Sequence, residues 1–200
     1  MSVGEDSGFP DLDEIDQRVK EFYDEVFNTY VNLVRPLRAD VREAATAMKE
    51  DDSLFARRSY LRAVFALFEG ELFASRTTIL QNIRYIDENT SLRLPLTDAE
   101  RTLLKEVEFS LDDDGNFRMR NRFQPHLAYL RFTVEVLCRY RGKPCAVDFT
   151  GQGWQAYRAA HAIRNRIMHP RRLEDLFISD DEVIQIKLAT RWFDDAMSNI

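Results

Sequence analysis

Cysteine and histidine are scarce in this chain of 200 residues. The sequence has two cysteines and three histidines, which are Cys138, Cys145, His126, His161 and His169. The cysteines form no CxxC pair, and the few histidines complete no zinc-ligand pattern. We therefore expect no metal and no cofactor, and we interpret both cysteines as buried free thiols. Free thiols are typical of the reducing cytoplasm.

A surplus of positive charge is also missing. The chain carries 28 Lys and Arg residues against 34 Asp and Glu residues, which gives a net charge of -6. A broad basic surface for non-specific nucleic-acid binding is therefore not expected, and neither is a DNA partner. A small local basic site remains open. No apolar run reaches the length of a membrane span, and the acidic residues 1–16 contain no hydrophobic signal core. We expect a soluble, cytoplasmic protein without a membrane partner.

Glycine and proline are few, at 7 and 6 residues, so helical periodicity runs through most of the chain. Residues 1–10 hold Gly, Ser and Pro and predict a flexible N-terminal tail. Apolar residues then recur at spacings of three and four, which predicts an N-terminal helical extension over residues 11–52. Pro36 should kink or break this helix, with a second segment from about residue 37 to 49. Residues 53–200 form the predicted main helical domain.

The main domain contains several further helical segments. They are expected at about 54–88, 97–109, 125–141, 150–168 and 179–197, and two of them begin with capping-box sequences. Gly70 lies inside the first of these helices, where close packing against another helix would explain its presence. The turn at Asp112–Asn116 separates flanks that could form a short hairpin. The sequence therefore predicts an all-α fold, a bundle of five to seven helices.

One motif lies where a helix should end. Arg164 and His169 are five positions apart, and on a continuing helix their side chains would point about 140° apart. Pro170 ends the helix and turns His169 away, which frees it to swing back toward Arg164. A similar spacing, Arg120 to His126, precedes a helix, and we interpret it as helix initiation. The Arg-x(4–6)-His spacing alone would arise by chance about once in this composition, so the context carries the argument.

The sequence Arg164-Asn165-Arg166-Ile167-Met168-His169 resembles the signature of the HEPN superfamily, which is Arg, a polar residue, three to five residues and His. The surrounding helices, over about residues 54–197, are also similar to that family's α-helical bundle. The resemblance implies RNA work, because many HEPN proteins are metal-independent endoribonucleases. They act as toxins, in antiviral defence or in RNA processing, and two protomers often share one cleft. Other members bind RNA or dimerise without cleaving.

The chemistry suits these residue types. RNA cleavage without a metal uses the 2′-OH as the nucleophile, so a group that titrates near neutrality must move protons, and His169 fits that role. Arg164 offers a planar, bidentate cation to the phosphate oxygens, whose charge grows in the transition state. Asn165 could hydrogen-bond a phosphate or orient the imidazole. Because one histidine serves one proton role at a time, a second His169 from a partner chain would supply the complementary acid or base.

Several neighbours are candidates for RNA binding or orientation. His161 lies one turn before Arg164 and shares its helix facet. Local positive charge comes from Arg158, Arg166, Arg171 and Arg172. Glu69 lies at the edge of the apolar stripe of helix 54–88, where it could pair with a motif Arg or orient His169. Structural roles remain open for each of them: an ion pair or cap for Arg164, a favourable helix-end charge for His169, and simple solvation for the arginines.

Three hypotheses about the function follow. The first is a HEPN-type ribonuclease that acts as a homodimer on single-stranded or structured RNA. The second is a non-catalytic module that dimerises or holds RNA, a nucleotide or a protein. The third is a helical antitoxin or adaptor in which the motif arises by chance. An antitoxin or other regulatory protein is a further expected partner of the first reading. The intact Arg, Asn and His set favours the ribonuclease, and the acidic composition favours the binding module.

Overall fold

The computed structural model describes residues 12–89 and 96–200. Within these ranges the chain forms six α-helices and one small two-stranded sheet, so the predicted all-α bundle is confirmed. The predicted tail at 1–10 lies outside the described residues. No helix in the described ranges is both long enough and apolar enough to cross a membrane.

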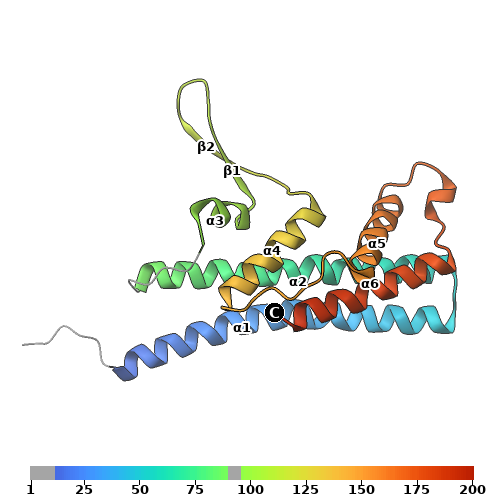
Figure 1. Cartoon of the computed structure of the whole chain (residues 1–200), viewed down its shortest axis with the longest axis horizontal. Helices are drawn as coiled ribbons and strands as arrows, with labels where there is room; N and C mark the ends of the chain where they lie inside the picture. Colours follow the sequence, from blue (N-terminus) through green and yellow to red (C-terminus); the bar gives the residue numbers. More distant parts are fainter. Residues whose placement is uncertain (1–11, 90–95) are drawn as a thin grey trace, which may run out of the picture.

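The two longest helices form the base of the fold. The helix α1 (Leu12–Glu50) runs to one end of the molecule, and α2 (Leu54–Asn89) returns beside it (Figure 1). Pro36 does not interrupt α1, so of the predicted kink or break the break is wrong, and the kink stays a prediction. Val34 and Leu37 on either side of Pro36 pack toward α2, while Pro36 itself is exposed. Packing on both sides of Pro36 holds the helix together and offsets the one backbone hydrogen bond that proline removes.

Gly70 explains how closely α1 and α2 approach. A Cβ atom at this position would collide with Cδ1 of Leu37 on α1. The predicted close packing of Gly70 against another helix is therefore confirmed. The helix tolerates a residue of low helix propensity here because the side chain of Leu37 occupies the space that a Cβ would need.

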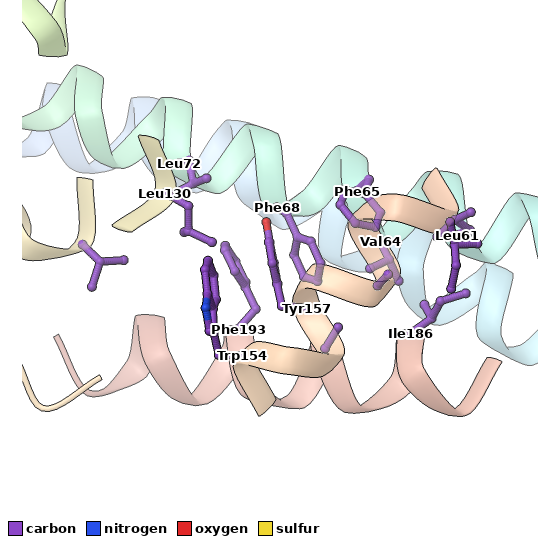
Figure 2. Close-up of a cluster of buried hydrophobic side chains, with 14 of the residues drawn as sticks. Leu61, Val64, Phe65, Phe68, Leu72, Leu130, Trp154, Tyr157, Ile186 and Phe193 are labelled. Atoms are coloured by element: carbon purple, nitrogen blue, oxygen red, sulfur yellow. The ribbon is translucent and has the colours of Figure 1, made fainter. Parts of the chain in front are cut away.

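Three further helices pack against α2, and one of them, the C-terminal helix, also reaches α1 through the ion pair of Asp194 with Arg38. They are α4 (His126–Tyr140), α5 (Gln152–Met168) and α6 (Asp180–Ser198), of which α5 and α6 pack on each other. Figure 2 shows the core between them and α2, where Phe68, Tyr157 and Phe193 come together. The ring centroid of Phe68 lies 5.0 Å from that of Tyr157 and 4.3 Å from that of Phe193. These contacts fix α5, which carries the Arg/His motif, against α2.

A short helix and a hairpin project from this body (Figure 1). The helix α3 (Asp98–Leu104) starts with the expected capping box at Thr97, but it ends five residues before the predicted Phe109. Glu106 adopts a φ of 50°, a left-handed conformation that a helix cannot contain. The chain then forms β1 (Val107–Leu111) and β2 (Phe117–Asn121), which confirms the expected hairpin.

The cysteine prediction is half right. Both thiols are free, and Cys138 is buried in α4, but Cys145 is exposed in the segment between α4 and α5. That segment follows Gly142, whose φ of 65° ends α4 in the left-handed conformation. Because the chain leaves the helix there, Cys145 lies off the apolar stripe that buries Cys138.

Candidate functional site

The Arg/His motif lies where α5 ends, as the sequence predicts. Met168 is the last helical residue, and His169 follows as the cap with φ −129° and ψ 57°. The backbone N–H of His169 still donates to the carbonyl oxygen of Asn165 at 3.1 Å. Pro170 then directs the chain toward a 3₁₀ turn, η1 (Leu173–Leu176), that leads into α6. The backbone therefore places the Cα atom of His169 directly after the last turn of α5.

Arg164 is held in place by an acid on another helix. Its Nη2 donates to Oε1 of Glu69 on α2 at 2.8 Å, and its Nη1 donates to Oδ1 of Asn165 at 3.2 Å. The Arg164 side chain is 26% exposed and that of Glu69 is 47% exposed. A pair this open to water contributes at most about 1 kcal/mol to stability. Its main effect is to set the direction of the guanidinium, and a phosphate could compete with Glu69 for it.

His169 does not fold back onto Arg164. Its side chain is exposed, and across residues 12–89 and 96–200 no hydrogen bond or ring contact joins it to Arg164. Asn165 is exposed as well, and its amide oxygen faces Arg164. The three motif residues thus share one end of α5, with Arg164 oriented by α2 and His169 free in solvent.

Two histidines outside the motif lie near enough to Arg164 to feel its charge. The rings of His126 and His161 are stacked with their centroids 4.8 Å apart and their planes 4° apart. Nε2 of His126 lies 2.7 Å from the hydroxyl of Tyr157. Phe65 on α2 lies against both imidazoles, with ring centroids at 6.3 Å and 6.2 Å. The start of α4 and the middle of α5 therefore meet through a histidine pair beside the candidate site.

Burial keeps these imidazoles neutral. Desolvation, helped by the charges of His161 and Arg164, lowers the pKa of His126 from 6.5 to about 4. Burial and the charge of Arg164 lower the pKa of His161 as well. Burial raises the pKa of Tyr157 well above its ordinary value, so its hydroxyl stays protonated and can donate to His126. This cluster adds hydrogen-bonding groups, but no positive charge, next to Arg164 at neutral pH.

Sequence reasoning missed His126 as a neighbour of the site. It is the first residue of α4, as expected for helix initiation, yet its ring faces α5. A signal was present in the spacing, because Leu130 and Val134 follow at intervals of four and both are fully buried. A residue one turn before such a stripe lies on the same face. The sequence could not show that His161 from another helix would meet that face.

The arginines around the motif divide into two groups. Arg166 donates to both carboxylate oxygens of Glu182, at 2.8 Å and 3.0 Å, and to the carbonyl oxygens of Asp175 and Phe177. It therefore ties α5 to η1 and to the start of α6, and little of its fork is left for a ligand. Arg158, Arg171 and Arg172 remain exposed. Arg171 and Arg172 give the end of α5 its accessible positive charge, and Arg158 lies in the first half of the helix.

The loop after the motif is shaped by one carboxylate. Oδ2 of Asp175 accepts hydrogen bonds from the backbone N–H groups of Arg171 and Arg172, at 2.8 Å and 3.0 Å. These bonds lower the pKa of the Asp175 carboxyl below its ordinary value. The backbone of both arginines is thus fixed while their side chains reach into solvent. Within the described ranges, no group of three or more His, Cys, Asp or Glu side chains is arranged to hold a metal ion.

Comparisons with protein-family models, with curated proteins and with solved structures found no match for this chain.

Proposed function

We propose that this chain is a metal-independent endoribonuclease of the HEPN type, with its reactive groups at the end of α5. The observation that carries the proposal is the position of Arg164, which Glu69 orients at the surface beside the exposed Asn165 and His169. A cation held at an open surface suits a polymer substrate, which could not enter a closed pocket. A role as a toxin, in antiviral defence or in RNA processing fits this activity.

Arg164 stabilises the reacting phosphate. Its bonds to Glu69 and Asn165 leave further N–H donors of the planar guanidinium open for phosphate oxygens. As the 2′-oxygen attacks phosphorus, negative charge grows on the non-bridging oxygens, and a cation already in position lowers the barrier. Glu69 acts through Arg164 as a positioning residue, because its carboxylate would repel a phosphate placed directly against it.

His169 moves the protons. Its imidazole takes the proton of the 2′-OH while the bond from phosphorus to the 5′-oxygen breaks, and an acid protonates that leaving oxygen. The products are a 2′,3′-cyclic phosphate and a free 5′-OH. Because the His169 side chain is exposed and makes no hydrogen bond to Arg164, a partner's copy of the motif is well suited to complete the site. A homodimer that shares one cleft would bring two imidazoles and two guanidinium groups to one phosphodiester.

RNA on either side of the cut would meet Arg158, Arg171 and Arg172. These side chains are exposed, and they offer phosphate contacts despite the acidic total charge of the chain. His161 lies one turn before Arg164 and can hydrogen-bond RNA as a neutral imidazole. Arg166 contributes indirectly, because its bonds to Glu182 hold the loop that carries Arg171 and Arg172. An antitoxin or other regulatory protein could act by covering this surface.

A second candidate is a non-catalytic HEPN-like module that binds RNA or a nucleotide, or dimerises. The ion pair between Arg164 and Glu69 favours it, because that bond neutralises the cation when no ligand is present. The separation of the His169 side chain from Arg164 favours it as well. The two candidates make opposite predictions for RNA cleavage.

The proposal is tested by incubating the full chain with labelled tRNA, rRNA and mRNA in excess EDTA. We expect wild-type protein to cleave, and we expect His169→Ala and Arg164→Ala to lose at least about a hundredfold in rate. Arg84→Ala is the matched control, because Arg84 is exposed on α2 and pairs with Glu88 in its own helix. Circular dichroism shows whether each variant folds. Wild-type protein that binds RNA without cleaving it would favour the second candidate.

A shared cleft makes a further claim about mixtures. If Arg164 of one protomer acts with His169 of its partner, equal amounts of Arg164→Ala and His169→Ala should regain activity when their subunits exchange. A mixture that stays inactive would show that one intact Arg164 and one intact His169 on different chains are not enough for cleavage.

A further inference from the structure

The hairpin separates its side chains into an apolar face and a charged face. The register pairs Phe109 with Met119 and Leu111 with Phe117. Directly opposed residues in an antiparallel pair share a face, and so do residues two apart in one strand. These four side chains therefore form one apolar ladder, and the rings of Phe109 and Phe117 stack with centroids 5.0 Å apart.

This apolar ladder lies open to solvent. Its exposed fractions are 44% for Phe109, 70% for Leu111, 69% for Phe117 and 66% for Met119, and Phe123 just beyond β2 is 91% exposed. Figure 1 shows the hairpin extending away from the two long helices. An isolated two-stranded hairpin is marginally stable in water, and clustered exposed apolar side chains mark an interaction site. We therefore expect another molecular surface to bury this apolar ladder.

The charged face of the hairpin argues against nucleic acid as the partner that buries the ladder. Arg118 pairs with Asp112 at 3.1 Å, and Arg120 pairs with Glu108 at 3.1 Å. Arg122 lies 3.6 Å from Glu108. Arg118 and Arg120 are thus paired with carboxylates of the hairpin itself, whereas Arg122 shares Glu108 with Arg120 and leaves a net positive charge at the base. A surface that attracts phosphates would leave such cations open, so the occupant of the apolar face is a protein surface.

Charge at the two ends of the hairpin fits a second copy of the same chain. The tip carries Asp113 and Asp114, and across residues 12–89 and 96–200 neither carboxylate has a cation against it. The base carries Arg122 and Lys105, which is exposed at the end of α3. If two hairpins pack antiparallel, the acidic tip of each one lies next to the positively charged base of the other. The parallel arrangement would instead place like charges together.

We propose that two copies of the chain dimerise by packing the apolar ladders of their hairpins face to face, antiparallel, about a two-fold axis. Such an isologous interface is self-complementary by symmetry. Large apolar side chains bury about 150–250 Å² each when fully covered, so these five partly exposed ones give roughly 500–600 Å² per copy. The total of roughly 1,000–1,200 Å² reaches the lower limit of a specific interface.

The test is the mass of the full chain in solution, measured by sedimentation over about 1–100 μM, a range suited to an interface of this size. We expect a dimer, and Leu111→Glu should raise the dimer dissociation constant at least about tenfold, because it places a carboxylate inside the apolar contact twice. Ser110→Glu is the matched control, because Ser110 precedes Leu111 on the opposite face and should leave the dimer intact. A wild-type monomer at every concentration would overturn the proposal, and so would a Leu111→Glu protein that dimerises like wild type.

The antiparallel arrangement has its own test. Asp113→Lys together with Asp114→Lys should weaken the dimer, and adding Lys105→Glu to that protein should restore part of the affinity. Charge reversal at the tip without any effect on the dimer would refute the antiparallel packing. A monomer that instead binds an RNA oligonucleotide through Phe117, with loss on Phe117→Glu, would assign the face to nucleic acid and overturn the proposal. A dimer of the wild-type protein would also fit a shared cleft at α5, so the comparison of Leu111→Glu with Ser110→Glu decides whether the hairpin forms the interface. RNA cleavage tests the α5 proposal separately.

Discussion

Stability should depend on pH through His126, because this imidazole is buried without a charged partner. Burial first, then the charges of His161 and Arg164, lowers its pKa from 6.5 to about 4. In the unfolded chain the same group binds a proton near pH 6.5. Between these two values the unfolded state holds more protons than the folded state, so the free energy of unfolding falls as the solution is acidified.

The size of the effect follows from the two pKa values. A difference from 6.5 to about 4 corresponds to roughly 3 kcal/mol, which is an upper estimate for a group that keeps some contact with water. This contribution is fully present above pH 6.5 and is lost progressively down to about pH 4. His161, whose pKa is also lowered, acts in the same direction.

The assay is urea unfolding at pH 7, 6, 5 and 4 for wild type and for His126→Gln, which does not titrate but can still hydrogen-bond the hydroxyl of Tyr157. Carboxylates contribute equally to both proteins, so the difference between the two curves isolates His126. We expect wild type to lose up to about 3 kcal/mol more than the variant between pH 7 and pH 4. Parallel curves for the two proteins would refute the reasoning that burial keeps this imidazole neutral.

Three further changes have expected outcomes. Gly70→Val should destabilise the fold by roughly 1 kcal/mol in thermal unfolding, because Cδ1 of Leu37 must move to make room for the new side chain, and a melting temperature at or above that of wild type would contradict this contact. Arg38→Met should cost about 2–3 kcal/mol, because it leaves the buried carboxylate of Glu71 without its cation, and Glu71→Gln in the same protein should recover part of the loss in urea unfolding. Arg164→Lys should retain RNA binding but lose at least about tenfold in cleavage rate, since an ammonium lacks the planar fork, and full activity would refute the bidentate contact.

The sequence predicted the helices that local patterns specify. The capping boxes at Thr97 and Ser179 begin helices where expected, and the Asp-rich turn forms the hairpin. These features depend on residues that are neighbours in the chain, so short-range physics determines them. The end of α5 before Pro170 belongs to the same class.

The errors have long-range causes. Pro36 stays inside α1 because packing against α2 outweighs one lost hydrogen bond, and the sequence of α1 does not contain that partner. The helix predicted through Phe109 ends early at the left-handed Glu106, where the hairpin takes over the chain. In both places a tertiary contact or a neighbouring element overrides the local preference.

The candidate site shows the same division. The backbone at Arg164 and His169 follows from the chain near Pro170, and Glu69 on α2 was a candidate partner from its place beside the apolar stripe. The stacking of His126 on His161 required the packing of α4 against α5, which spacing within one helix cannot reveal. The ion pair between Arg166 and Glu182 likewise depends on how α6 packs back against α5.

The most direct test of the proposed ribonuclease is the chemistry of the RNA ends after digestion in excess EDTA. We expect wild-type protein to leave 2′,3′-cyclic phosphate ends and His169→Ala to leave none at equal concentration. Cyclic phosphate ends from both proteins would place the cleavage outside this motif, and intact RNA with both proteins would contradict the proposed activity.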